Sequence, residues 1–202
     1  QRAVAAQERG FFEREIIPVG DVVKDDGPRP GTTVEKLAGL APAFRPDGRV
    51  TAGNACPLND GAAAVVVMSE TRASALGVTP LARIVSSGVS ALSPEIMGLG
   101  PIEASRQALK RAGLSIEDID QVEINEAFAA QVLPSAKHLG IDIDRQLNPN
   151  GGAIALGHPF GMTGARIMTT LINGLEDSGG RYGLETMCVG GGQGMAMIVE
   201  RL

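Results

Sequence analysis

Two glycine-rich stretches near the carboxyl end carry most of the structural information in this chain. Residues 150–159 have the sequence NGGAIALGHP, and residues 188–194 have the sequence CVGGGQG. They contain His158 and Cys188, one of only two histidines and one of only two cysteines in the chain. Glycine lets a backbone bend sharply and approach another group closely. The pattern predicts two loops at the ends of apolar segments, each presenting one reactive side chain.

Segments typical of strands and helices alternate around these loops. The expected strands are residues 83–89, 121–125, 185–189 and 195–201, and the expected helices are residues 103–112, 126–139 and 164–177. Gly113, Gly140 and Gly179 are placed to end the three helices. Alternating strands and helices, followed by two adjacent strands, predict an α/β fold with a mixed sheet.

The first 80 residues are less regular. Residues 1–17 predict a helix with a charged face, whereas DDGPRPG at residues 25–31 makes residues 18–50 irregular. The apolar run AAAVVVM at residues 62–68 predicts a buried strand. Ser69 and Gly77 then bound a short helix. The change in pattern near residue 80 predicts a domain boundary.

Composition excludes several classes of protein. The chain has 202 residues and 44% apolar residues, enough for one or two domains with a sizeable core. A net charge of −5 argues against a nucleic-acid partner. The longest apolar run, residues 62–68, is too short to cross a bilayer, so no membrane association is expected. Two distant cysteines outside any CxxC motif form no disulfide framework, which favours the cytoplasm.

His158 lies between Gly157 and Pro159, and the proline biases the histidine toward an extended backbone. An imidazole held in this way can act as a base near neutral pH or donate to an oxyanion. A core histidine satisfied by a backbone carbonyl is an equally open interpretation of the tripeptide.

Cys188 and Asn125 each close an expected strand. Three glycines follow closely after the cysteine, so its thiol and several backbone amides could point to one place. The thiol could then act as a nucleophile or as an acid/base, and the amides could bind an oxyanion. The alternative is a buried cysteine that behaves as a small apolar residue. Asn125 could position a water or a substrate oxygen, although a helix cap is the simpler explanation, and Glu126 could be a first-turn acid.

These stretches resemble the motifs of the thiolase family of acyl-CoA acyltransferases, together with NEAFA at residues 125–129, GNA at 53–55 and MGLGP at 97–101. The similarity covers nearly the whole chain. It implies a thiolase-like layered fold with a mixed five-stranded sheet covered by helices, in the order βαβαβαββ. Residues 1–58 would be the remainder of a substrate-covering loop region. Residues 59–80 would end the first thiolase core domain, and residues 81–202 would form the second.

The resemblance also implies roles for single residues. His158 would activate the nucleophilic cysteine and contribute to one oxyanion hole, with Asn125 holding the water of that hole. Cys188 would be the acid/base, and Gly190 the backbone donor of the other hole. Met97 and Cys56 would lie near the pantetheine arm of CoA. Many family members have serine at position 56, where this chain has cysteine.

The implied function is thiolytic cleavage of a 3-ketoacyl-CoA to acetyl-CoA and a shortened acyl-CoA, as in fatty acid β-oxidation, or the reverse Claisen condensation. The family's acyl-carrying cysteine belongs to an amino-terminal half that these 202 residues do not contain, so the isolated chain is expected to be inactive. Acyl-CoA and CoA are the expected substrates. No permanently bound cofactor and no metal are expected. The expected partners are the amino-terminal half and further copies, in a homodimer or homotetramer.

Two alternatives remain beside a thiolase. A ketoacyl synthase of the same fold would use two histidines, whereas Cys188 stands where the second would be expected. A non-catalytic structural half of a thiolase-like assembly is a rival from another class, and the retained Asn125, His158 and Cys188 argue against it. Neither the acyl chain nor the physiological direction follows from these residues.

Overall fold

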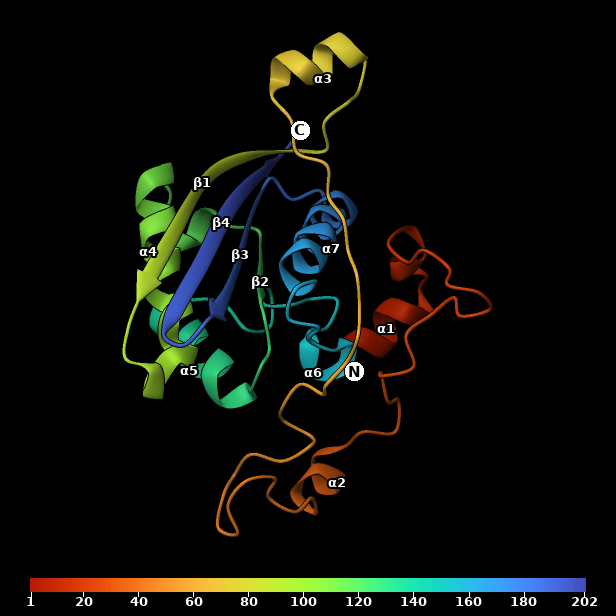
Figure 1. Ribbon diagram of the computed structural model, residues 1–202, viewed down its shortest axis with the longest axis vertical. Coiled ribbons are helices and arrows are strands. Elements are labelled where there is room, and N and C mark those ends of the chain that lie inside the picture. Colours follow the sequence, from red (N-terminus) through yellow and green to blue (C-terminus); the bar gives the residue numbers. More distant parts are fainter.

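A computed structural model describes all 202 residues, and a four-stranded mixed sheet lies at its centre (Figure 1). The strands follow the spatial order β1 (Ala82–Ala91), β4 (Gln193–Arg201), β3 (Tyr182–Val189) and β2 (Gln121–Ile124). β4 is antiparallel to both of its neighbours, and β2 is parallel to β3. The predicted α/β fold with a mixed sheet is confirmed.

Helices cover both faces of the sheet. α4 (Gly100–Ala112) and α5 (Ala129–Leu139) pack on one face, over a core that includes Val122, Leu184 and Ile198. α7 (Thr163–Ser178) covers the other face (Figure 1). The short helices η2 (Pro94–Leu99), η3 (Ile116–Asp118) and α6 (Ala153–Leu156) lie in the connections. No helix in the chain combines the length and the apolar character that crossing a membrane requires.

The three expected helix-ending glycines are confirmed. Gly113, Gly140 and Gly179 follow α4, α5 and α7 with φ angles of 68°, 76° and 71°. This left-handed conformation is one that glycine adopts without a steric penalty, so these residues end the helices as their positions predict.

The sheet has four strands, not the expected five. From β1 onward, the strands and α-helices follow the order βαβαααββ instead of the expected βαβαβαββ. The place beside β2 is taken by a single bridge between Val122 and Leu147. Asn148 then pairs with the strand through its side chain, accepting from Ile124 N at 2.9 Å and donating to Ile124 O at 3.0 Å. A left-handed φ of 41° turns Asn148 away from strand geometry, which ends the pairing after one residue.

The amino-terminal helix is shorter than predicted. α1 (Arg2–Glu8) and η1 (Phe11–Arg14) replace the single helix expected over residues 1–17. Gly10, with a φ of 76°, separates them because its left-handed conformation cannot continue a helix. The segment is fixed to α7 by Glu15, which accepts hydrogen bonds from the side chains of Thr170 and Asn173.

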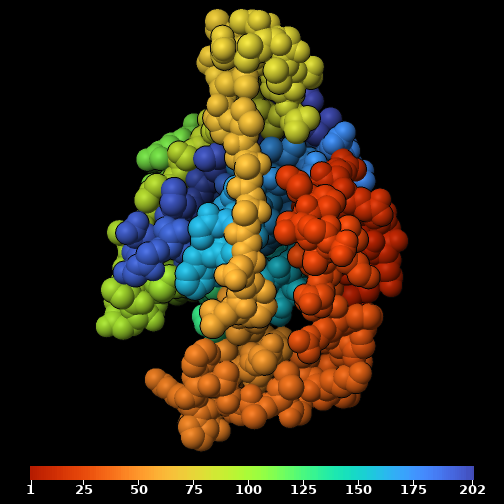
Figure 2. Space-filling view, turned by 45° about the vertical axis from the view of Figure 1, so that its right-hand side comes forward, coloured from red at the N-terminus to blue at the C-terminus, as the bar shows by residue number.

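Residues 18–50, which were expected to be irregular, contain one short helix, α2 (Val34–Ala38), and no strand. The buried strand predicted over residues 62–68 is wrong for this chain. The segment pairs with no strand, and Val65, Val66 and Val67 are 45%, 84% and 71% exposed. Figure 2 shows it crossing the surface as an isolated column. A strand needs neighbours for its N–H and C=O groups, and the sheet of this chain does not reach these residues.

The short helix after this segment forms as predicted. α3 (Glu70–Leu76) is capped by Ser69, whose Oγ accepts a hydrogen bond from Arg72 N at 3.2 Å. Gly77 ends the helix with a φ of 66°. The helix therefore forms from its local capping interactions, even though the preceding residues 62–68 pair with no sheet.

Two carboxyl groups are buried between the sheet and α7. Glu123 of β2 and Glu185 of β3 are register partners in the parallel pair. Burial raises the pKa of both from 4.5 to about 8, although the nearby charge of Arg166 on α7 lowers it. Glu123 also accepts a hydrogen bond from the side chain of Gln121 at 3.1 Å. Both carboxyl groups are therefore predominantly neutral at neutral pH.

The raised pKa of Glu123 makes folding depend on pH. The folded state keeps a proton that the unfolded state releases between the ordinary pKa of 4.5 and about 8, so stability falls as pH rises through this window. Glu123→Gln cannot ionise, and we expect it to be more stable than the wild type at pH 8 by on the order of 1–3 kcal/mol, with a smaller gain at pH 5. Thermal unfolding at both pH values, with exposed Glu117→Gln as the control, measures this. An equal effect at the two pH values would contradict it.

Candidate active site

Three of the predicted site residues come to one edge of the sheet because β2 and β3 run in parallel. Asn125 directly follows β2, and its backbone N donates to Thr186 O of β3 at 3.0 Å. Cys188 lies near the carboxyl end of β3. A short connection joins α7 to the start of β3, so the first turn of α7 and the His158 loop before it lie at this same edge (Figure 1).

His158 is half-buried and held from two sides. Its backbone N donates to Asn59 Oδ1 at 3.3 Å, and its Nδ1 lies 2.7 Å from Thr163 Oγ1. Gly157 has a φ of 91°, and a side chain there would collide with Asn59, so glycine is required before the histidine. Burial lowers the pKa of His158, and the positive charge of Arg166 adds to this effect. The imidazole is therefore mainly neutral at pH 7 and able to accept a proton.

Cys188 is buried, with 9% of its surface exposed. Burial raises the pKa of its thiol, and the nearby thiol of Cys56 adds a smaller effect in the same direction. The group is therefore a protonated thiol at neutral pH, which suits a proton donor better than a resting nucleophile. Gly190 and Gly192 follow with φ angles of 55° and 113°, so the turn between β3 and β4 depends on glycine.

Asn125 is 1% exposed, and neither its Nδ2 nor its Oδ1 has a hydrogen-bond partner within the chain. It does not cap a helix, because α5 begins at Ala129 with Phe128 as its N-cap. The capping interpretation is therefore wrong. A buried amide left without partners costs about 1–3 kcal/mol, so such groups are characteristic of sites that bind a ligand or an ordered water.

Glu126 has a role that its sequence position did not indicate. Glu126 is not the first-turn acid that its position suggests, because α5 starts three residues later, at Ala129. Its carboxylate instead accepts hydrogen bonds from Ile154 N at 3.1 Å and Asn148 Nδ2 at 2.8 Å. A side chain at Gly152 would collide with this carboxylate. Glu126 therefore ties the glycine-rich loop before His158 to the end of β2.

Cys56 and Met97 lie in segments beside the site. Cys56 is half-buried, and its backbone N donates to Ala127 O at 3.0 Å. Burial raises the pKa of its thiol, so little thiolate is present at neutral pH. Met97 is half-buried in η2, which packs against α5, β3 and β4. Contact of either residue with CoA stays a prediction.

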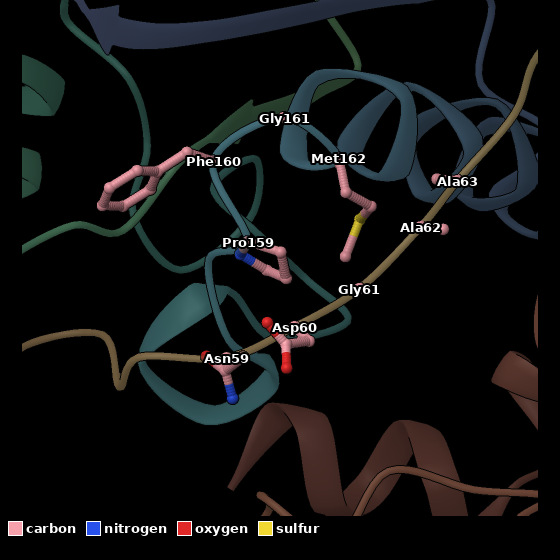
Figure 3. Close-up of a pocket in the computed structure, with 9 residues that line it drawn as sticks. All are labelled: Asn59, Asp60, Gly61, Ala62, Ala63, Pro159, Phe160, Gly161 and Met162. Carbon is pink, nitrogen blue, oxygen red and sulfur yellow. The ribbon is translucent and has the colours of Figure 1, made fainter.

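A surface cleft of about 380 Å³ lies where residues 59–63 cross the loop of residues 159–162 (Figure 3). Gly61 packs so closely that a side chain there would lie 2.7 Å from Pro159 and 2.8 Å from Met162. In Figure 3 the Phe160 ring points away from this cleft, and its side chain is largely exposed. The crossing segment therefore covers one side of the loop and leaves Phe160 uncovered.

Comparisons with known proteins agree with this architecture. The family model for the thiolase C-terminal domain matches residues 78–201, and that for the thiolase N-terminal domain matches residues 1–71. The 3-ketoacyl-CoA thiolase of Salmonella typhimurium (strain LT2) is 55% identical, over 100% of this chain and 55% of the relative. The chain therefore spans about half the length of the curated relatives it matches.

Solved structures show the same relation. The crystal structure of the Bacillus anthracis acetyl-CoA acetyltransferase superposes with a TM-score of 0.94 at 48% identity, covering 100% of this chain and 53% of that one. Human mitochondrial 3-ketoacyl-CoA thiolase in complex with CoA gives a TM-score of 0.93 at 46% identity, covering 100% and 52%. The thiolase-like fold predicted from the motifs is confirmed.

The raised thiol pKa values predict slow alkylation. At pH 7 we expect Cys56 and Cys188 to react with iodoacetamide at least about tenfold more slowly than glutathione, because little thiolate is present. Cys56 should react before Cys188, which is the more deeply buried thiol. Both rates should increase as pH rises above 9, and peptide mass spectrometry follows them separately. Modification of Cys188 at the glutathione rate would show an activated thiolate instead.

Proposed function

Because this chain belongs to the thiolase family, we propose that it is the carboxy-terminal part of an acyl-CoA acyltransferase that cleaves 3-ketoacyl-CoA with CoA, or runs the reverse condensation. The observation that carries this proposal is the set of groups at one sheet edge. They are a neutral imidazole at His158, a protonated thiol at Cys188 and an unpartnered buried amide at Asn125. A base, an acid and an oxyanion-binding group are what the reaction requires.

In the first half-reaction, His158 takes the proton of a cysteine thiol supplied from outside these 202 residues. The thiolate attacks the 3-keto carbon, and the bond between C2 and C3 breaks. The acyl group stays on that cysteine as a thioester, and acetyl-CoA leaves as its enolate. Cys188 gives its proton to the enolate carbon. His158 and a water held by Asn125 stabilise one oxyanion, and the backbone N–H of Gly190 stabilises the other.

In the second half-reaction, CoA takes the acyl group from the enzyme. Cys188, now a thiolate, removes the proton of the CoA thiol and regains its acid form. The CoA thiolate attacks the thioester, and the cysteine of the first half-reaction leaves as a thiolate. We propose Cys56 and Met97 as contacts of the pantetheine arm. CoA takes part as a substrate, and the scheme uses no permanently bound cofactor or metal.

The proposal includes an amino-terminal half of similar length that carries the acyl-accepting cysteine. Relatives are about twice as long as this chain, and the exposed valines at residues 65–67 lack the sheet that their sequence predicts. In this arrangement residues 1–58 belong to the loop region, 59–80 to the first core domain and 81–202 to the second. We further propose a homodimer or homotetramer that acts in the cytoplasm, in fatty acid β-oxidation. The name of the Salmonella relative supports the degradative direction.

Removing either proposed proton-transfer group should nearly abolish activity. Cys188→Ala is expected to lower kcat for acetoacetyl-CoA thiolysis by about 10²–10⁴-fold, because that is the usual contribution of a general acid or base. His158→Ala should cost at least as much, since it removes a base and an oxyanion donor together. The assay uses the full-length enzyme and circular dichroism to check folding. His138→Ala, at the exposed histidine of α5, is the matched control. Activity within a few-fold of wild type for Cys188→Ala would reduce that residue to a packing role.

The isolated chain should have no thiolase activity. Neither Cys56 nor Cys188 corresponds to the acyl-carrying cysteine of the family, so no acyl-enzyme can form. Residues 1–202 are expressed alone and with a separately encoded amino-terminal half, and both samples are assayed with acetoacetyl-CoA and CoA. We expect turnover only when both parts are present. Turnover by residues 1–202 alone would refute the division of roles.

A further inference from the structure

Thr163, the first residue of α7, is fully buried against the ring of His158. Its Oγ1 lies 2.7 Å from His158 Nδ1 and 2.9 Å from Pro159 O. The same carbonyl accepts the backbone N–H groups of Met162 and Thr163, at 3.0 and 3.1 Å, so the start of the helix fixes its position. The hydroxyl therefore lies between a ring nitrogen and an immobile carbonyl oxygen.

These two contacts determine the direction of the hydrogen bonds. A threonine hydroxyl carries one proton, and a carbonyl oxygen carries none. Both contacts can be hydrogen bonds only if Thr163 Oγ1–H donates to Pro159 O and His158 Nδ1–H donates to Thr163 Oγ1. The reverse arrangement leaves two oxygen atoms 2.9 Å apart with no hydrogen between them. The neutral imidazole is thereby held with its proton on Nδ1.

We propose that Thr163 is a positioning residue that holds His158 as the Nδ1–H tautomer, so that Nε2 alone exchanges protons with the reacting groups. This inference rests on the proposed function and specifies how the histidine of that site is held. Nδ1 is occupied by Thr163, whereas Nε2 has no hydrogen-bond partner within the chain. The partner of one ring nitrogen decides the protonation of the other.

The tautomer matters because His158 enters the reaction neutral. Burial and the charge of Arg166 lower the pKa of the ring, so a neutral imidazole meets the attacking thiol. With the proton on Nδ1, the bare Nε2 accepts the proton of that thiol. The resulting Nε2–H then donates to the oxyanion that forms next. One nitrogen thus serves both steps, and the opposite tautomer could not begin the first.

The test combines kinetics with a direct observation of the tautomer in the full-length enzyme. Segmental labelling confines ¹⁵N-histidine to residues 1–202, where His138 and His158 are the only histidines. Long-range ¹H–¹⁵N spectra at about pH 8 show which ring nitrogen carries the proton. The variants are Thr163→Val, Thr163→Ser and Thr169→Val. Thr169 is the matched control, because its hydroxyl bonds Ala165 O at 2.9 Å on the same helix without contacting the histidine.

We expect wild-type His158 to be the Nδ1–H tautomer. Thr163→Val should populate both tautomers and lower kcat/KM by about 10- to 100-fold, since an orienting partner of a catalytic histidine contributes at least this much. Thr163→Ser keeps the hydroxyl and should stay within about threefold of wild type. Thr169→Val should change neither the spectrum nor the rate.

Two results would overturn the inference. One is a wild-type His158 protonated on Nε2, which is decisive even if Thr163→Val does not fold. The other is a Thr163→Val enzyme that keeps the pure Nδ1–H form and full activity. An Nδ1–H signal in a wild-type enzyme without thiolysis would instead overturn the proposed function and leave the tautomer assignment standing.

Discussion

The parallel pairing of β2 with β3 is the constraint on which the candidate site depends. Parallel strands present their carboxyl ends at the same edge, so Asn125 and Cys188 lie at this edge although 62 residues separate them in the chain. The return of α7 beside β3 brings the His158 loop to that edge. An antiparallel β2 would have sent Asn125 to the opposite end. Sheet topology, and not proximity in sequence, assembles the three groups.

Hydrogen bonds also fix the positions of the loops at this edge. Glu126 binds the loop that leads to His158, and Asn148 joins that loop to β2 by acting as a substitute for backbone pairing. Thr163 then holds the imidazole itself. Thr163 belongs to α7, whereas Glu126 and Asn148 lie just beyond β2 and beside it, where Asn148 bonds to Ile124 of the strand. Cys188 lies on β3 itself, and the irregular segments that carry His158 and Asn125 are held in place by bonds to neighbouring strands and helices.

The sequence predicted those features that local chemistry determines. Gly113, Gly140 and Gly179 end helices because a left-handed conformation suits glycine wherever the chain lies. The strand expected at residues 62–68 failed because strand formation needs a partner, which periodicity cannot report. The position of Asn125 between a strand and a helical pattern favours a helix cap, because the sequence does not show that α5 begins only at Ala129. The family motifs identified the fold correctly, since glycine-rich loops of such length and order are specific.

Thr163 and Glu126 were missed as supports of the site for a related reason. Threonine five residues after a histidine has no special meaning until a helix begins at that threonine. Glutamate after a strand is commonplace until a loop 28 residues later is found to bind it. Reactive groups have recognisable residue types, whereas the residues that orient them are ordinary polar residues whose role depends on tertiary contacts.

The exposed valines at residues 65–67 have a consequence for the order in which the protein folds during synthesis. A ribosome releases these valines only after all of residues 1–58. In the proposed full-length enzyme, the sheet that receives these valines must therefore remain open while residues 1–58 emerge. The strands that pair are then far apart in the sequence. Their pairing forms slowly because the long intervening loop must first be closed. The sheet of β1, β4, β3 and β2 pairs only strands of this chain and does not share this delay.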